Sequence, residues 1–126
     1  MSFLDRYGAL ILGITRIIVG LLFLEHGLAK LAHFPPVPMF ANGNLPPMIL
    51  VSGCIELAGG ALVALGFFSR IAAFVCSGMM AVAYFIVHAP QGFFPILNSG
   101  ELAIVYCFLF LYLAASGPGA FAINDK

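Results

Sequence analysis

Residues 21–30, LLFLEHGLAK, place Glu25, His26 and Lys30 at the end of an apolar run that begins near Tyr7 and is long enough to cross a lipid bilayer. A charged side chain at the centre of the hydrocarbon costs at least ~2.5 kcal/mol, so such residues are expected to face protein and to have partners. The fold must therefore provide partners for these three side chains.

The composition of the whole chain indicates an integral membrane protein. Of its 126 residues, 63% are hydrophobic and only 8% are charged, and the mean hydropathy is +1.12. A soluble helical bundle needs polar outer faces, and this chain has too few polar residues to supply them. Its formal net charge is zero, which leaves no basic surface for nucleic acid. We therefore expect contact with membrane lipid and none with nucleic acid.

Clusters of Pro and Gly divide the chain into four apolar segments, at about residues 7–34, 46–67, 69–89 and 99–117. Each segment reaches or approaches the roughly 20 residues that a membrane-spanning helix needs. The very short connection at 66–69 makes the second and third segments antiparallel neighbours. The predicted fold is an all-α membrane protein, an antiparallel bundle of four transmembrane helices that forms a single domain over residues 1–126.

The positions of Lys and Arg predict the orientation of this bundle. Arg6, Arg70 and Lys126 fall on one side of it, whereas Lys30 lies toward the other. The positive-inside rule then places both termini in the cytoplasm. The small-residue runs GCIELAGGA and CSGMMAVA allow helices to approach closely, either within one chain or between copies.

The connections PPVPMFANGNLPP and APQGFFPILNSG share the outer side of the bundle in this orientation. Both are rich in Pro, Gly and Asn, which is typical of non-helical connections. Their residues Phe40, Phe93 and Phe94 either form an apolar cap or pack as ordinary loop residues. We expect these two loops to cover the outer end of the bundle.

All four segments carry titratable residues, and helical spacing turns most of them toward a common interior. Glu25 is the exception, and its expected contact is a neighbouring helix or a partner subunit. Charges that face lipid are costly, which favours a polar interior in the outer half of the bundle. The predicted ligand-binding residues are His26, Lys30, Glu56, His88 and Glu101.

The three cysteines Cys54, Cys76 and Cys107 occur singly, without a CxxC pair. This spacing predicts neither a metal site nor a dithiol motif. We expect each thiol to act as a small apolar residue of its helix.

The motifs that surround these residues resemble the DoxX family. They follow one another along nearly the whole chain: HGLAK (26–30), ELAGG (56–60), GFFSR (66–70), His88, GF (92–93), GELA (100–103) and GPG (117–119). The resemblance implies a four-helix protein of the bacterial inner membrane. Some members are subunits of thiosulfate:quinone oxidoreductase, and others are linked to oxidant defence, quinone resistance or membrane redox complexes.

These observations predict an integral membrane subunit of a redox or respiratory complex that binds a quinone-like molecule in its outer polar cluster. A quinone carbonyl needs hydrogen-bond donors, and its reduction needs protons that His26 or His88 can supply, with Glu56 and Glu101 as a relay. No haem, flavin or metal motif is evident, so quinone is the one cofactor that we expect. Electrons then come from a partner redox protein, and a homo-oligomer is the other expected assembly.

The alternative is a non-catalytic scaffold or assembly subunit whose buried charges only orient the helices. In this interpretation, ion pairs such as Lys30 with Glu101 or Arg16 with Glu56 fix the packing, and Arg16 and Arg70 are the candidate ion-pairing residues. Whether the chain itself catalyses a reaction is open at this point.

Overall fold

The computed structural model describes residues 2–40 and 45–126, and all regular structure in these ranges is helical. The long helices are α2 (Gly8–Leu31), α3 (Pro47–Leu65), α4 (Ser69–Ala83) and α6 (Glu101–Ser116). The shorter elements are α1 (Ser2–Asp5), η1 (Pro38–Phe40), the π-helical segment η2 (Tyr84–His88), η3 (Ala89–Gln91) and α5 (Pro95–Asn98). Residues 41–44, part of the expected loop PPVPMFANGNLPP, lie outside the described residues.

The prediction of an all-helical membrane protein is confirmed. Three helical stretches are long and apolar enough to cross a bilayer, Gly8–Leu31, Pro47–Leu65 and Ser69–Gln91, the last of which joins α4 to η2 and η3. At ~1.5 Å per residue they measure roughly 28 to 36 Å, which matches a hydrocarbon core of ~30 Å. Helix α6 is also apolar, and its 16 residues measure roughly 24 Å.

Several helix boundaries differ from those expected, and two of the differences have a clear local cause. Helix α2 ends at Leu31 rather than near residue 34, because His33 has a φ of 55° and Pro35 follows two residues later. Helix α6 begins at Glu101 rather than near residue 99, because the side chain of Asn98 accepts the backbone N–H of residue 100 and closes the preceding turn.

Helices α2 and α3 pack backbone against backbone along a row of glycines. Gly20 and Gly27 of α2 face Gly53 and Gly60 of α3, and a Cβ atom added at Gly20 would lie 2.5 Å from the backbone nitrogen of Ala64. No side chain larger than hydrogen fits at such a contact. The run GCIELAGGA, for which two kinds of packing were open, therefore packs within the chain.

The other helix interfaces pack through side chains around an apolar core. Phe23 of α2 contacts Tyr106 and Phe110 of α6, with ring centroids 5.3 and 4.8 Å apart. The hydroxyl of Ser77 on α4 donates to the carbonyl of Cys107 on α6 at 2.7 Å. Helices α3 and α4 also pack together, but their interface is less extensive than those of α2 with α3 and of α4 with α6.

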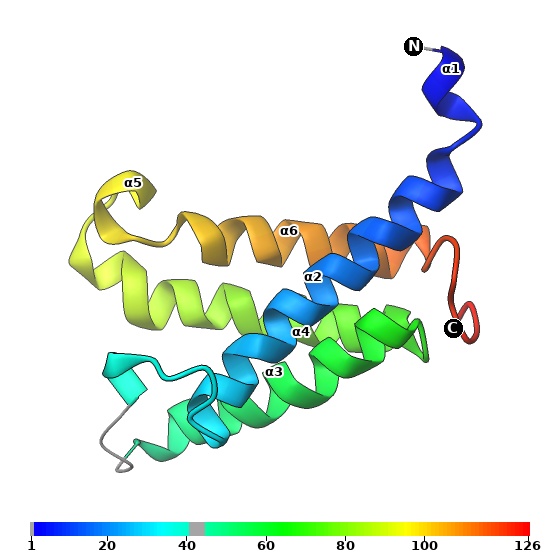
Figure 1. Cartoon of the computed structure of the whole chain (residues 1–126). Coiled ribbons are helices and arrows are strands. Elements are labelled where there is room, and N and C mark those ends of the chain that lie inside the picture. Colours follow the sequence, from blue (N-terminus) through cyan, green and yellow to red (C-terminus); the bar gives the residue numbers. More distant parts are fainter. Residues whose placement is uncertain (1, 41–44) are drawn as a thin grey trace.

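Residues 117–126 lie across one end of the helices (Figure 1). The backbone N–H of Ala120 donates to the carbonyl of Ala9 at 2.9 Å, and that of Asn124 donates to the carbonyl of Gly66 at 3.1 Å. The start of α2, the end of α3 and this C-terminal segment therefore lie at the same end of the molecule.

Candidate functional site

Lys30 and Glu56 form the one ion pair that the described residues contain, with 2.7 Å between Nζ and Oε1. Glu56, in the middle of α3, is only 2% exposed, and Lys30 lies in the last turn of α2. The close approach at Gly27 and Gly53 brings the two helices near enough for the lysine to reach across. The ammonium also donates to the hydroxyl of Ser52 at 3.0 Å. Sequence reasoning missed Ser52, because a serine among small residues also fits plain helix packing.

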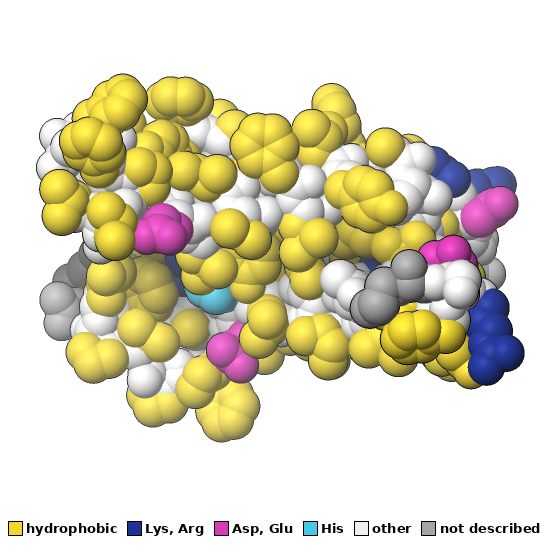
Figure 2. Space-filling model, turned by 90° about the horizontal axis from the view of Figure 1, so that it is seen from above, with side chains coloured by type: hydrophobic (Ala, Val, Ile, Leu, Met, Phe, Trp, Pro, Cys, Tyr) yellow, Lys and Arg dark blue, Asp and Glu magenta, His cyan; other side chains and the backbone are white. Residues whose placement is uncertain are grey.

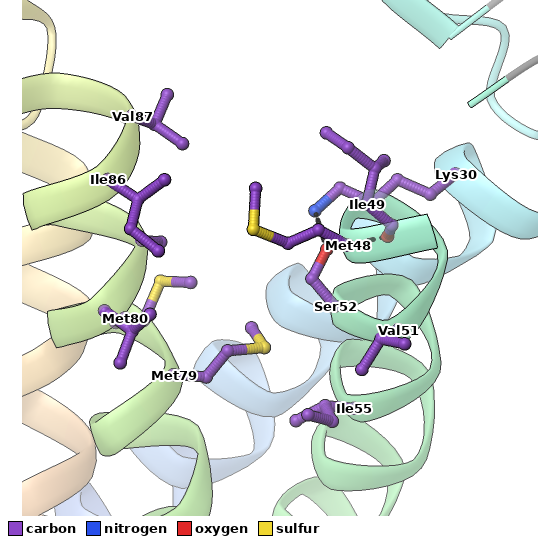
Figure 3. Close-up of a pocket in the computed structure, with 12 residues that line it drawn as sticks. Lys30, Met48, Ile49, Val51, Ser52, Ile55, Met79, Met80, Ile86 and Val87 are labelled. Carbon is purple, nitrogen blue, oxygen red and sulfur yellow. Dashed lines mark hydrogen bonds between the residues drawn. The ribbon is translucent and has the colours of Figure 1, made fainter. Parts of the chain in front are cut away.

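An apolar cleft of about 250 Å³ opens between α3 and α4 beside this ion pair (Figure 3). Lys30 and Ser52 contribute polar groups to its lining, while residues such as Met48, Met79 and Val87 form apolar walls. The figure shows the amino group of Lys30 reaching past α3 toward Ser52. An ammonium has three N–H donors, and the contacts to Glu56 and Ser52 use two of them.

His26 lies one turn before Lys30 on α2, near α6. Its ring meets the ring of Tyr106 edge-on, with centroids 6.1 Å apart, and its Nδ1 hydrogen-bonds with the carbonyl of Leu22 at 2.9 Å. His26 shares a helical face with Lys30, which lies four residues later and pairs with Glu56. The structure therefore brings three predicted site residues into one neighbourhood, His26, Lys30 and Glu56.

His88 belongs to a separate polar cluster. Its Nδ1 hydrogen-bonds with the backbone carbonyl of Asn98 at 3.0 Å, and its ring stacks on that of Tyr84 at 6.3 Å. The Asn98 side chain is fully buried and donates to the carbonyl of Gly92 at 2.9 Å and to the Tyr84 hydroxyl at 3.2 Å. No periodic pattern marks Asn98 in the sequence, because it ends the four-residue helix α5.

Glu101 is exposed at the first position of α6, where a carboxylate interacts favourably with the helix dipole. Glu25 is exposed on α2, and its expected contact with a neighbouring helix or a partner subunit stays a prediction. Figure 2 shows acidic side chains beside a histidine within an otherwise apolar face of the molecule. No contact described for His88 or Glu101 reaches Lys30 or Glu56.

Arg16 makes no ion pair with Glu56, so that expected pairing is wrong. The guanidinium is 0% exposed and donates to backbone carbonyls, those of Pro118, Ala120 (2.9 Å) and Phe121 (3.1 Å). The C-terminal segment crosses close enough to α2 for its carbonyls to surround the charge. Arg16 thus links α2 to the C-terminal segment, and backbone carbonyls take the place of the expected carboxylate.

Arg70 is bound in the same way at the start of α4. It donates to the carbonyls of Ala115 and Asp125, both at 3.0 Å, and to that of Ala114 at 3.3 Å. The described residues show no carboxylate partner for it. The pairing of Lys30 with Glu101 is likewise wrong, because Glu56 holds the lysine.

The phenylalanines of the outer loops do not form one cap. Phe93 is 85% exposed and Phe94 is 60% exposed, so both point away from the protein. Phe40 alone approaches the candidate site, with its ring 5.8 Å from Nζ of Lys30. Residues 2–40 and 45–126 contain no group of three or more metal-ligating side chains.

Comparison with known proteins places the chain in a family. The model of the DoxX family matches residues 6–89. An uncharacterized protein of Haemophilus influenzae is 47% identical over 130 aligned positions, which cover 100% of this chain and 97% of that protein. The inner membrane protein YqjF of Escherichia coli is 26% identical over 98% of this chain and 95% of its own length. No solved structure matches the chain. Since the family model covers well over half of the sequence, the chain belongs to the DoxX family, as its motifs predicted.

Proposed function

We propose that this protein is a four-helix antiparallel bundle of the bacterial inner membrane, with both termini in the cytoplasm, that holds a quinone-like head group beside Lys30 as a subunit of a membrane redox complex. The location of its relative YqjF in the inner membrane supports the choice of membrane. The shared end of α2, α3 and the C-terminal segment supports placing both termini on one side.

One observation carries the ligand proposal: the Lys30 ammonium lies at an otherwise apolar cleft. Ligand sites are typically apolar cavities with a few convergent polar groups that fix the ligand's orientation. Lys30 and Ser52 are such groups, and the lysine retains a donor for a ligand carbonyl. An ion pair that only orients two helices requires no cleft beside it.

The charge balance of the pair favours a neutral head group. The buried carboxylate of Glu56 compensates the ammonium, so an anionic ligand meets no excess positive charge. A quinone carbonyl accepts a hydrogen bond without bringing a charge. His26 contacts Tyr106 of α6 and does not line the cleft, so its role as proton donor stays a prediction. Electrons come from a partner redox protein, while ligand roles for His88 and Glu101 stay predictions.

The test is the quinone content of the purified protein by organic extraction. A double variant, Lys30→Met with Glu56→Met, removes both charges together, and apolar replacement of a buried pair is often neutral for stability. It should fold as well as the wild type and carry about tenfold less quinone, because a charged hydrogen-bond donor is lost. Lys126→Met, which removes an exposed ammonium, is the matched control.

The second candidate is the scaffold function, which the direct link between α2 and α3 through Lys30 and Glu56 favours. In that case the wild-type protein carries no quinone, or carries as much as the double variant, and purifies with a stoichiometric partner protein. Either of these quinone results refutes the ligand proposal.

A further inference from the structure

Two cavities lie one after the other along the interface of α3 and α4, and we call them together the groove. The cleft beside Lys30 and a second cavity of about 360 Å³ share Ile55 as a wall residue. The second cavity extends to Phe68 and Ile71, at the far end of the interface. From Met48 to Leu62 the α3 side of this groove measures roughly 21 Å.

Small side chains keep this groove open. Ala58, Gly59 and Ala72 line its far half, and a Cβ atom added at Gly59 would lie 2.5 Å from Sγ of Cys76. The helices therefore touch at Gly59 but leave space on the outer side of this contact. Val51 and Val75, which also line the groove, are exposed, so the groove opens sideways toward lipid.

The polarity of the groove differs between its two ends. Lys30 and Ser52 lie at one end, and the lining of the far half contributes almost no polar surface. A molecule that matches this pattern has one small polar head and one long apolar chain. Resting on the function proposed above, we propose that the groove holds the polyprenyl tail of a quinone whose head group lies at Lys30.

Two other occupants match the groove less well. An α-helix with its side chains is roughly 10 Å across, and cavities of 250 and 360 Å³ are too small to contain one. A phospholipid brings a phosphate and two acyl chains, whereas the ion pair has no net charge and the groove is single. A single linear polyprenyl chain fits both the neutral end and the apolar length.

The experiment compares two quinones with the same head group, one without a tail and one with a long polyprenyl tail. Binding of each is measured with the full-length protein in detergent, for the wild type and for Ala58→Phe, which fills the far half of the groove. Ala58 is exposed, so a larger side chain there meets no neighbouring helix core. Cys54→Phe, on an exposed position of α3 outside both cavities, is the matched control.

We expect Ala58→Phe to lose about fivefold in affinity for the long-chain quinone, because packing contacts along the tail are lost. Its affinity for the tail-less quinone should not change, and Cys54→Phe should bind both as the wild type does. Each affinity is expressed as the ratio of variant to wild type. Partition of a quinone into detergent affects both measurements equally, so it cancels in this ratio.

Three results overturn the proposal. If Ala58→Phe binds the long-chain quinone as the wild type does, the tail lies elsewhere, although the head-group site stands. If Ala58→Phe instead loses a co-purified phospholipid, seen by native mass spectrometry, with no change for either quinone, the groove is a lipid site. If the wild type binds neither quinone, the proposed function itself fails.

Discussion

At the scale of single residues, the buried guanidinium of Arg16 is the main departure from simple charge pairing. Burial of a charge is costly unless its donors are satisfied and its charge is compensated. Here the carbonyls of the C-terminal segment point their negative ends at the guanidinium, and that of Ala64 on α3 adds a contact at 3.4 Å. The planar fork of an arginine has five donors in a fixed geometry and can serve more carbonyls at once than the three donors of a lysine.

Replacement of Arg16 should therefore loosen the C-terminal segment. Arg16→Leu leaves buried carbonyls without donors and should lower the free energy of unfolding by about 3 kcal/mol, and Arg16→Lys should restore only part of it. Unfolding in mild detergent measures the loss, and limited proteolysis reports release of residues 117–126. Arg6→Leu, at an exposed position, is the control. An unchanged unfolding curve for Arg16→Leu would contradict this account of the segment.

A site residue could be predicted from the sequence only where its side-chain chemistry and its position on a helix identified it without knowledge of its partners. Lys30 and Glu56 were both predicted as ligand-binding residues, since charges on apolar helices are costly when they face lipid, but their pairing with each other was not predicted. The partners of Arg16 could not be predicted, because every residue has a carbonyl and the sequence does not mark which ones converge. Asn98 was missed for a similar reason: its contacts depend on the turn that it creates.

At the scale of helices, the glycine row between α2 and α3 makes these two helices a close pair. Without a hydrophobic drive between helices in lipid, association depends on packing and on close backbone approach. The row and the ion pair lie on the same interface, so the tight packing also fixes where Lys30 meets Glu56.

A methyl group on this row should separate the helices. In Gly60→Ala the added Cβ would lie 2.6 Å from the backbone nitrogen of Leu24 and 2.7 Å from the carbonyl oxygen of Gly20. We expect a loss of about 2 kcal/mol in unfolding free energy, typical of overpacking. Gly78→Ala is the matched control, because nothing lies within 4 Å of a Cβ there, and it should be neutral or slightly stabilising. Equal stability of the two variants would contradict the close approach.

The existence of the long helices could be predicted from apolar runs, but their details could not. Proline and glycine clusters gave approximate ends, and the short turn between α3 and α4 identified neighbours. The π-helical segment Tyr84–His88 has no such pattern, since one extra residue per turn leaves hydropathy unchanged. It lies beside the Asn98 cluster, so the π segment and the turn together set the position of His88.

At the scale of the whole molecule, packing is uneven. The pairs α2 with α3 and α4 with α6 are extensive, and the interface that joins them, between α3 and α4, is the looser one. A cleft inside either pair would disrupt one of the two extensive interfaces. A cleft between α3 and α4 leaves the packing within each helix pair intact. The proposed ligand groove lies there.

The proposed orientation makes a separate prediction about the two ends of the molecule. A cysteine at position 126 should react with a membrane-impermeant maleimide only after spheroplasts are permeabilised, and one at position 91 should react in intact spheroplasts. Lys126 and Gln91 are exposed, so substitution should leave the fold intact. The wild-type chain with its native cysteines is the control. Labelling of Lys126→Cys in intact spheroplasts would reverse the orientation.

The contact between Arg16 and the C-terminal segment also bears on the order of events during synthesis. Pro118 follows Arg16 by 102 positions. At a translation rate of about 5–20 residues per second, Arg16 exists for about 5–20 s before its carbonyl partners do. Throughout that interval water or lipid phosphate must solvate the charge, which keeps this part of the first helix near the membrane surface. The helix can settle to its final depth only once the carbonyls of residues 118–121 have been synthesised and can surround the charge.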